Sequence, residues 1–336
     1  MGGIRDMVLA AAVGFLGAAL MGLFLLPLLK SLRFGQGEED LSQGKPKGPE
    51  EAPPAAGGIL LLCAMVAGVL LCGGEGMGAS LPCLLFALAF GSVGFLDEGL
   101  RIYKKKGQGL LPWQKGMLEL ALSIGAALWL YINKGSVICL PFSGRAWDMG
   151  FFFLPFAVLI LLGTLKGACS MEEPQGLLCP MGCMQFLTCG LLFGLMTAGT
   201  ELTKWGPDTA NLNGMAAFCG AAAGGCLGFQ LFNCPPAKGR MGEAGALALG
   251  SALAMGALVS GQGLLLLLMG IGYGLSLLSM LVQWMYGKRQ KGKTFFKAMP
   301  FHRHLLACGV PEGRLISLYG ILTAAACIFS LLTYLL

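Results

Sequence analysis

Charged side chains are scarce in this chain of 336 residues: Asp, Glu, Lys and Arg together make up 12%, and histidine occurs only twice. Hydrophobic residues account for 56%, which is more apolar surface than a soluble protein of this length can bury. The composition therefore excludes a soluble globular protein and indicates a membrane protein with several spans. The net charge of +6 does not indicate a nucleic-acid partner, because the basic residues are spread over several loops.

The cysteines also lack the spacing of a metal or redox site. Cys179 and Cys183 are separated by three residues, which is not the C-x-x-C spacing, and no histidine lies nearby in the sequence. Seven of the thirteen cysteines fall inside apolar runs, where cysteine behaves as a small hydrophobic residue. We therefore expect them to serve in packing.

Ten apolar runs predict ten membrane-spanning helices, and thus an all-α polytopic membrane protein with residues 1–336 as a single domain. Two of the runs, 150–165 and 244–258, are short for a bilayer, so we expect tilted or partly buried helices there. The first run lacks a clear small-residue cleavage site, so no cleavable signal peptide is expected. The predicted spans are 7–29, 57–74, 79–96, 115–133, 150–165, 177–199, 213–232, 244–258, 262–286 and 315–335.

The loops between these runs differ sharply in charge. Five of them hold 19 of the 23 Lys and Arg residues, and the positive-inside rule therefore places these five in the cytoplasm and both termini outside. The first loop, 30–56, includes a stretch rich in Gly, Pro, Glu and Lys that predicts mobility. The five basic loops are Lys30–Ala56, Asp97–Lys115, Lys166–Gly176, Asn233–Glu243 and Gly287–Arg314.

An acidic pair interrupts the third apolar run where it meets the second basic loop. Asp97 and Glu98 are adjacent, and Arg101 follows Asp97 by four residues, so the two would share a face if the helix continues. A solvated, charge-balanced helix end is the simpler explanation. Carboxylates at the mouth of a membrane helix are nevertheless costly unless they pair, bind a metal or face water, which favours a functional site.

The other basic loops each carry one short unusual element. Alone, each has a structural explanation: Asn-Cys-Pro-Pro as a turn, Met-Gly-Glu as a carboxylate at a helix start, His-Arg-His as a solvated group. Together they converge on one membrane face. The elements are Arg33-Phe-Gly-Gln36, Gly94-Phe-Leu-Asp97, Glu172-Glu173-Pro-Gln175, Asn233-Cys-Pro-Pro236-Ala237 with Met241-Gly-Glu243, and Met299-Pro300-Phe-His302-Arg303-His304.

Taken in order and with their spacing, these elements resemble the bacterial phospho-N-acetylmuramoyl-pentapeptide transferases of the polyprenyl-phosphate N-acetylhexosamine-1-phosphate transferase superfamily. The resemblance implies ten helices around a cytoplasm-facing cleft in the bacterial cytoplasmic membrane. It implies transfer of phospho-N-acetylmuramoyl-pentapeptide from a UDP carrier to undecaprenyl phosphate, with Mg²⁺ as cofactor and UMP as product, and it suggests a homodimer. The chemistry fits the carboxylates, because Mg²⁺ prefers oxygen ligands and neutralises charge during phosphoryl transfer.

The resemblance also implies a role for each candidate residue. Catalytic roles fall to Asp97, Glu98, Glu172, His302 and His304; substrate contacts fall to Asn233, Arg101, Lys166, Gln175 and Arg303; metal coordination falls to Glu243 and Asp97.

This chain departs from the family where the chemistry should occur. Glu98 and Glu243 stand at aspartate positions, and the triple histidine is His302-Arg303-His304. A lysine of the first loop is replaced near Glu50. In the third loop, Asn, Asn, Asp and Asp of the family correspond to Lys166, Cys169, Glu172 and Gln175.

Two hypotheses follow from these departures. The first is an active, divergent transferase that acts either on the nucleotide sugar of the family or on a different one. The second is an impaired paralogue that binds polyprenyl phosphate or a partner without turnover, with weak Mg²⁺ binding because the Lys166 ammonium neutralises part of the carboxylate cluster. A transporter is less favoured, because the sequence lacks the Gly/Pro-broken helix pairs with midplane charges that are typical of that class.

Overall fold

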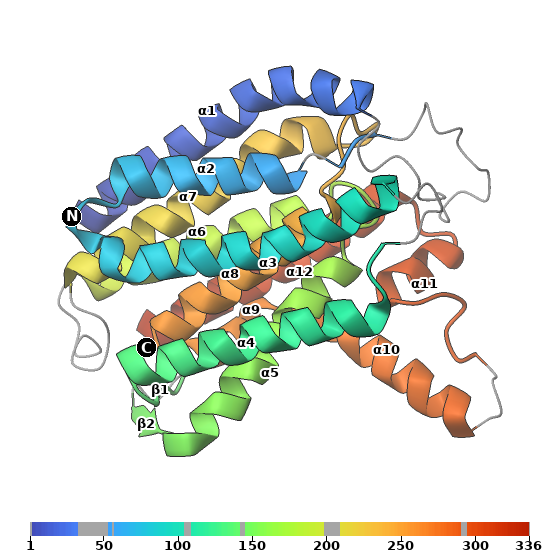
Figure 1. Ribbon diagram of the computed structural model, residues 1–336. Helices are drawn as coiled ribbons and strands as arrows, with labels where there is room; N and C mark the ends of the chain where they lie inside the picture. Colours follow the sequence, from blue (N-terminus) through green and yellow to red (C-terminus); the bar gives the residue numbers. More distant parts are fainter. Residues whose placement is uncertain are drawn as a thin grey trace.

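The computed structural model describes residues 2–32, 53–55, 57–103, 109–141, 145–197, 209–289 and 294–335. Within these ranges the chain forms twelve α-helices, two short 3-10 turns and one two-stranded hairpin (Figure 1). The helices are α1 (Gly2–Ser31), α2 (Gly57–Cys72), α3 (Met77–Tyr103), α4 (Pro112–Lys134), α5 (Phe153–Ser170), α6 (Leu178–Met196), α7 (Thr209–Asn233), α8 (Gly242–Val259), α9 (Gly263–Met269), α10 (Ile271–Arg289), α11 (Phe301–Ala307) and α12 (Glu312–Leu335); the 3-10 turns are η1 (Gly74–Gly76) and η2 (Gly150–Phe152), and the strands are β1 (Val137–Cys139) and β2 (Ala146–Asp148).

Every predicted span coincides with helical structure, and the chain is an all-α, multi-pass membrane protein. Among the described residues, α1, α3 to α8 and α12 are each long and apolar enough to cross a bilayer. The α9–α10 pair passes the same test together, while α2 is apolar but shorter, at 16 residues. The predicted loop 30–56, with the Arg33–Gln36 element and Glu50, lies almost entirely outside the described residues.

The prediction of one continuous span over 262–286 was wrong. The helix breaks at Gly270, and the two halves are bent by 78°. The side-chain amide nitrogen of Gln185 on α6 donates a hydrogen bond to the Met269 backbone carbonyl (2.9 Å). The Tyr273 hydroxyl donates to the side-chain amide oxygen Oε1 of the same Gln185 (2.9 Å). These bonds satisfy a carbonyl that the break removes from the helical ladder. The α9–α10 pair is therefore a broken helix. A transporter had been disfavoured partly because no such helix was predicted.

Two helices extend further into the basic loops than predicted. α3 continues to Tyr103, and α5 continues to Ser170. Asp97, Glu98 and Lys166 are therefore helical residues, where the sequence had placed them at the starts of loops. The helices continue beyond the apolar runs because the charged side chains at these ends are paired, Asp97 with Arg101 and Lys166 with Glu119.

A seam of glycines joins α1 to α7. Gly220, Gly224 and Gly228 recur at four-residue spacing on α7, and a Cβ atom at each would collide with backbone oxygens of α1. Small residues at this spacing let helix backbones approach closely, which is how membrane helices gain packing energy. In Figure 1 the two helices run side by side.

α8 forms the centre of the bundle. Nearly all of its residues are buried, which is more than the tilted or partly buried helix that the short run 244–258 predicted. It is lined with small residues, and a Cβ atom at Gly94 of α3 would lie 2.6 Å from the Ala244 Cα atom. This close approach places the first turn of α8 beside Asp97 and Glu98.

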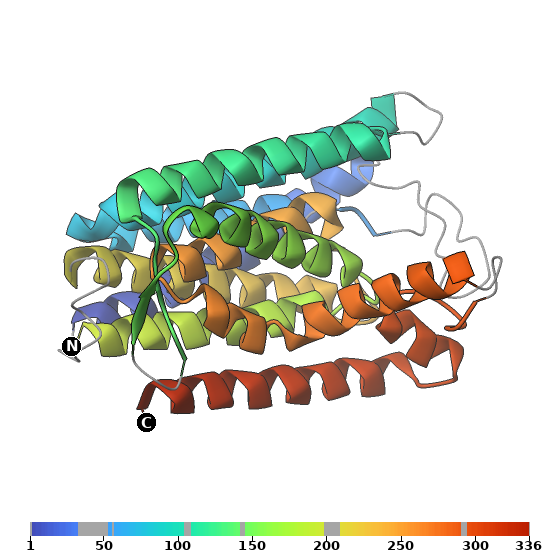
Figure 2. The same ribbon diagram turned by 90° about the horizontal axis from the view of Figure 1, so that it is seen from below.

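Both termini and the β1–β2 hairpin lie at one end of the bundle, whereas α11 and the charged ends of α3 and α10 lie at the other (Figures 1 and 2). This arrangement agrees with the predicted grouping of the basic loops. All thirteen cysteines are thiols without a disulfide, and Cys179 and Cys183 are buried, which confirms their packing role.

Candidate functional site

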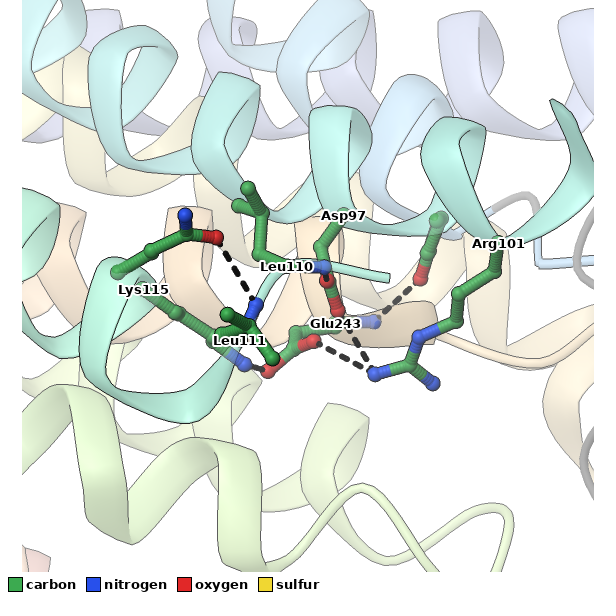
Figure 3. A network of polar contacts seen from close by, with 8 residues as sticks. Asp97, Arg101, Leu110, Leu111, Lys115 and Glu243 are labelled. Carbon is green, nitrogen blue, oxygen red and sulfur yellow. Dashed lines mark hydrogen bonds and ion pairs between the residues drawn. The ribbon is translucent and has the colours of Figure 1, made fainter. Parts of the chain in front are cut away.

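Asp97 is buried, and it contacts the short segment 109–111 that precedes α4. The Arg101 guanidinium donates to Asp97 Oδ2 at 2.7 Å, and the Leu110 backbone N–H donates to Oδ1 at 2.5 Å (Figure 3). The pairing of Asp97 with Arg101 confirms the prediction from their four-residue spacing. Both carboxylate oxygens of Asp97 therefore already accept a hydrogen bond.

Glu243 lies between two cations. The Lys115 ammonium, in the first turns of α4, contacts Glu243 Oε1, and Arg101 lies 3.6 Å from Oε2 (Figure 3). The same Arg101 nitrogen pairs with Asp97, so one guanidinium joins the two carboxylates that the resemblance assigns to the metal. We call Asp97, Arg101, Lys115 and Glu243 the charged network.

Glu98 caps the start of α8. Its Oε1 atom accepts a hydrogen bond from the Glu243 backbone N–H at 2.6 Å, and its side chain is only 4% exposed. The N–H groups in the first turn of a helix have no helical partner, and a carboxylate there is favourable toward the helix dipole. Gly242 has a φ of +73°, and a Cβ atom there would lie 2.6 Å from Glu98 Oε1. Glycine is therefore required for this contact.

A second ion pair lies beside the network. Lys166 of α5 places its ammonium 2.5 Å from Oε2 of Glu119, one turn beyond Lys115 on α4. Glu119 is fully buried, while the Lys166 side chain is 47% exposed. Lys166 therefore pairs with Glu119, and the cations that contact Glu243 are Lys115 and Arg101; the hypothesis that Lys166 neutralises part of the cluster of Asp97, Glu98, Glu172 and Glu243 stays a prediction.

The third loop is fastened to two other elements. Asn233, at the end of α7, accepts a hydrogen bond from the Gly176 backbone N–H at 2.5 Å. Arg303 of α11 donates to Glu173 at 2.7 Å. Glu172 and Gln175 are half-buried in the same loop. Asn233 and Arg303 thus each contact a different residue of this loop.

His302 and His304 have different surroundings, although both lie on α11. His302 is fully buried against Tyr319 of α12, with ring centroids 6.4 Å apart. Burial, followed by the charge of Arg303, lowers the pKa of His302 to about 4, against a smaller opposing effect of the Glu173 backbone. The imidazole of His302 is therefore neutral near pH 7. His304 accepts a hydrogen bond from the Lys297 backbone N–H at 3.2 Å.

The structure thus brings four of the predicted residues together, namely Asp97, Glu98, Arg101 and Glu243. Asn233 and Arg303 contact the third loop instead, and Lys166 pairs with Glu119. The sequence analysis missed Lys115 as a site residue and missed Glu119 altogether. Their signal was a pair of opposite charges, four residues apart, in an apolar helix, where ionisable groups are rare and usually partnered.

The comparisons with known proteins identify the family of the chain as a whole. The family model for glycosyl transferase family 4 matches residues 80–261, which include most of α3, all of α4 to α8 and the charged network. A phospho-N-acetylmuramoyl-pentapeptide-transferase of Clostridium perfringens strain 13 is 33% identical over 326 residues, 95% of this chain and 96% of the relative. The transferase of Heliobacterium modesticaldum is 33% identical over 91% of this chain and 89% of its own length, and one from Clostridium botulinum strain Alaska E43 is 30% identical over 95% and 94%. The chain belongs to the phospho-N-acetylmuramoyl-pentapeptide-transferase family.

Proposed function

We propose that this protein transfers phospho-N-acetylmuramoyl-pentapeptide from its UDP carrier to undecaprenyl phosphate in the bacterial cytoplasmic membrane. A phosphate oxygen of the lipid forms a bond to the sugar-bearing phosphorus, and the bond from that phosphorus to UMP breaks. The observation that carries this proposal is the relationship to transferases of this name over nearly the whole length of both chains.

The charged end of the bundle supports the proposal. Arg101, Lys115, Lys166 and Arg303 gather there, and clustered cations favour the approach of anionic phosphates. The apolar helices around this end allow a lipid phosphate to reach it from the bilayer. We assign Asp97 and Glu243 to the reacting centre, and Asn233 and Arg303 to the shape of the third loop.

Mg²⁺ is the cofactor that the family implies, but the residues as arranged do not fit it. This ion requires near-octahedral oxygen coordination at about 2.1 Å. Both oxygens of Asp97 and both of Glu243 face an N–H donor or a cation from the protein. An ion could use these oxygens only after Arg101 and Lys115 had moved, so weak Mg²⁺ binding remains our prediction.

The same observation favours a second candidate function. Because Arg101 and Lys115 already neutralise the carboxylates, the protein could bind polyprenyl phosphate or a partner enzyme without turnover. In that case the fold and the lipid site would be retained while transfer is lost.

A transfer assay separates the two candidates. Purified protein would be incubated with radiolabelled UDP-N-acetylmuramoyl-pentapeptide and undecaprenyl phosphate, with and without Mg²⁺, and labelled lipid and released UMP would be measured. We expect labelled lipid from the unmodified protein and from Lys238→Asn, an exposed lysine of the same end, and none from Asp97→Asn. If no lipid is labelled but undecaprenyl phosphate raises the unfolding temperature, the second candidate is correct.

The membrane orientation has its own test. We propose that the end carrying α11 faces the cytoplasm. Cys234 and Cys308 are the two exposed cysteines, and both lie at this end. An impermeant maleimide should therefore label neither in intact cells, but should label a Trp147→Cys variant in the hairpin at the other end. Labelling of Cys308 from outside would contradict the proposed orientation and place the end carrying α11 outside the cell. The homodimer suggested by the resemblance can be tested by light scattering of the solubilised protein.

A further inference from the structure

Glu119 is an unusual residue in its place. It lies on α4, a helix apolar enough to span a membrane, and its side chain is fully buried. Neither carboxylate oxygen makes a hydrogen bond of normal geometry among the described residues. Its contact is the Lys166 ammonium of α5, 2.5 Å from Oε2. The carboxylate is therefore balanced by this one charge and not by a set of hydrogen bonds.

The two partners depend on each other unequally. A carboxylate out of water is unfavourable unless it is paired, and removing the partner of a buried charge is strongly destabilising. Lys166 is 47% exposed, so water can still solvate its ammonium if Glu119 is removed. Glu119 consequently needs Lys166 far more than Lys166 needs Glu119.

The pair borders the charged network. Lys115 and Glu119 are four residues apart and share a face of α4, and Lys115 contacts Glu243 of α8. Cys169, three residues beyond Lys166, lies within electrostatic range of both Lys115 and Glu119. The α4 helix thus makes two ion pairs. It contributes the cation to the pair with α8 and the carboxylate to the pair with α5.

We propose that Lys166 is the positioning residue of this contact: its ammonium neutralises the buried Glu119 carboxylate, and the matched pair holds the end of α5 against α4 at the edge of the candidate site. Position 166 holds a neutral asparagine in the family that the chain resembles. The lysine here is paired with a buried carboxylate on the facing helix α4. The contact between the two helices is therefore retained at this position as an ion pair. An asparagine at position 166 alone would leave a buried charge; it requires the simultaneous change Glu119→Gln. This pairing concerns how α4 and α5 pack at the edge of the site, and it does not depend on the proposed function.

Four variants test this dependence: Lys166→Asn, Lys166→Arg, Glu119→Gln and the double variant Glu119→Gln/Lys166→Asn. The measurement is the unfolding temperature of the solubilised protein. We expect Lys166→Asn to lower it by about 5–10 °C, while Glu119→Gln costs much less. Lys166→Arg keeps the cation and should stay close to the unmodified protein. The double variant should regain most of the loss. Lys238→Asn is the matched control, since it removes an exposed lysine at the same end.

A local measurement distinguishes positioning from general stability. The maleimide labelling rate of Cys169, resolved by peptide mass spectrometry, reports the end of α5, and Cys63 of α2 serves as an internal reference; both are half-buried. At a temperature where all variants are folded, Lys166→Asn should speed the labelling of Cys169 several-fold relative to Cys63, and the double variant should restore it. The proposal is overturned if the double variant shows no rescue, including failure to accumulate, or if Glu119→Gln costs as much as Lys166→Asn.

Discussion

The α1–α7 seam and the charged network hold the same bundle together by different means. The seam contains glycines whose missing side chains let Gly220, Gly224 and Gly228 lie against the α1 backbone. The network contains side chains of opposite charge that come from three helices, α3, α4 and α8, as in Asp97–Arg101 and Lys115–Glu243. The seam is determined by shape and the network by charge.

The two kinds of contact should differ in which changes they tolerate. A seam without side chains offers no compensating substitution, because any added atom meets backbone. A charged contact can be exchanged for a neutral one if both partners change together. Under this difference a family fold can persist while charged pairs at its site change together.

The largest effect is expected in the seam. Gly224→Val places a side chain against the Ala11 backbone oxygen, and the two helices would have to separate. We expect a loss of about 3 kcal/mol or more in the free energy of unfolding, with poor accumulation in membranes. Gly17→Val is the control, since a Cβ atom at Gly17 meets nothing within 4 Å. Equal behaviour of the two variants in an unfolding titration would show that the seam is not tightly packed.

The next effect concerns the network. Among the residues that the structure describes, Lys115→Met leaves Glu243 with Arg101 at 3.6 Å as its remaining cation. Because the Glu243 side chain is only 15% exposed, we expect a loss of about 2–3 kcal/mol. Added Mg²⁺ should then recover part of the unfolding temperature, whereas it should change the unmodified protein little. A calorimetric or thermal titration with MgCl₂ measures both quantities.

Lys134→Met, at the other end of α4, is the matched control for that titration and should show no response to Mg²⁺. If the unmodified protein already binds Mg²⁺ tightly, Arg101 and Lys115 do not compete for the carboxylates. The second candidate, an impaired paralogue, would then lose its structural support.

These two regions also differ in how far the sequence predicted them. The bundle followed from apolar runs, because a spanning helix must satisfy its backbone internally whatever its neighbours are. The break at Gly270 was missed, because the bond from Gln185 that stabilises it comes from a distant helix. The pairing of Asp97 with Arg101 was predicted, because it is local in sequence. The partners of Glu243 and Lys166 were not, because Lys115 and Glu119 meet them only through the packing of α4, α5 and α8.

A smaller effect should appear on acidification. The pKa of His302 is lowered to about 4 from an ordinary value near 6.5, so the unfolded chain takes up a proton in this window and the folded protein does not. Stability should be unaffected above pH 7.5 and should fall as the pH decreases from 6.5 toward 4, by about 2 kcal/mol at pH 5. His302→Phe cannot take up a proton and should lose this component. The measurement is the difference between the two proteins in unfolding temperature across pH 7.5–5; parallel curves would contradict the shift.

The smallest effect is expected at Arg303, which is paired with Glu173 but partly exposed to solvent. Exposed ion pairs contribute about 0.2–1 kcal/mol, so Arg303→Gln should change stability at pH 7.5 by less than 1 kcal/mol. The same guanidinium also lowers the pKa of the neighbouring His302, and its removal should raise that pKa. Acid destabilisation should therefore be weaker in Arg303→Gln than in the unmodified protein, although the pair itself is lost. Unfolding curves at pH 7.5 and pH 5 for Arg303→Gln, with His302→Phe/Arg303→Gln as control, measure both effects. A large loss at pH 7.5 would show that Arg303 is needed to hold the third loop in place, and the contact would then belong with the buried pairs rather than with the exposed ones.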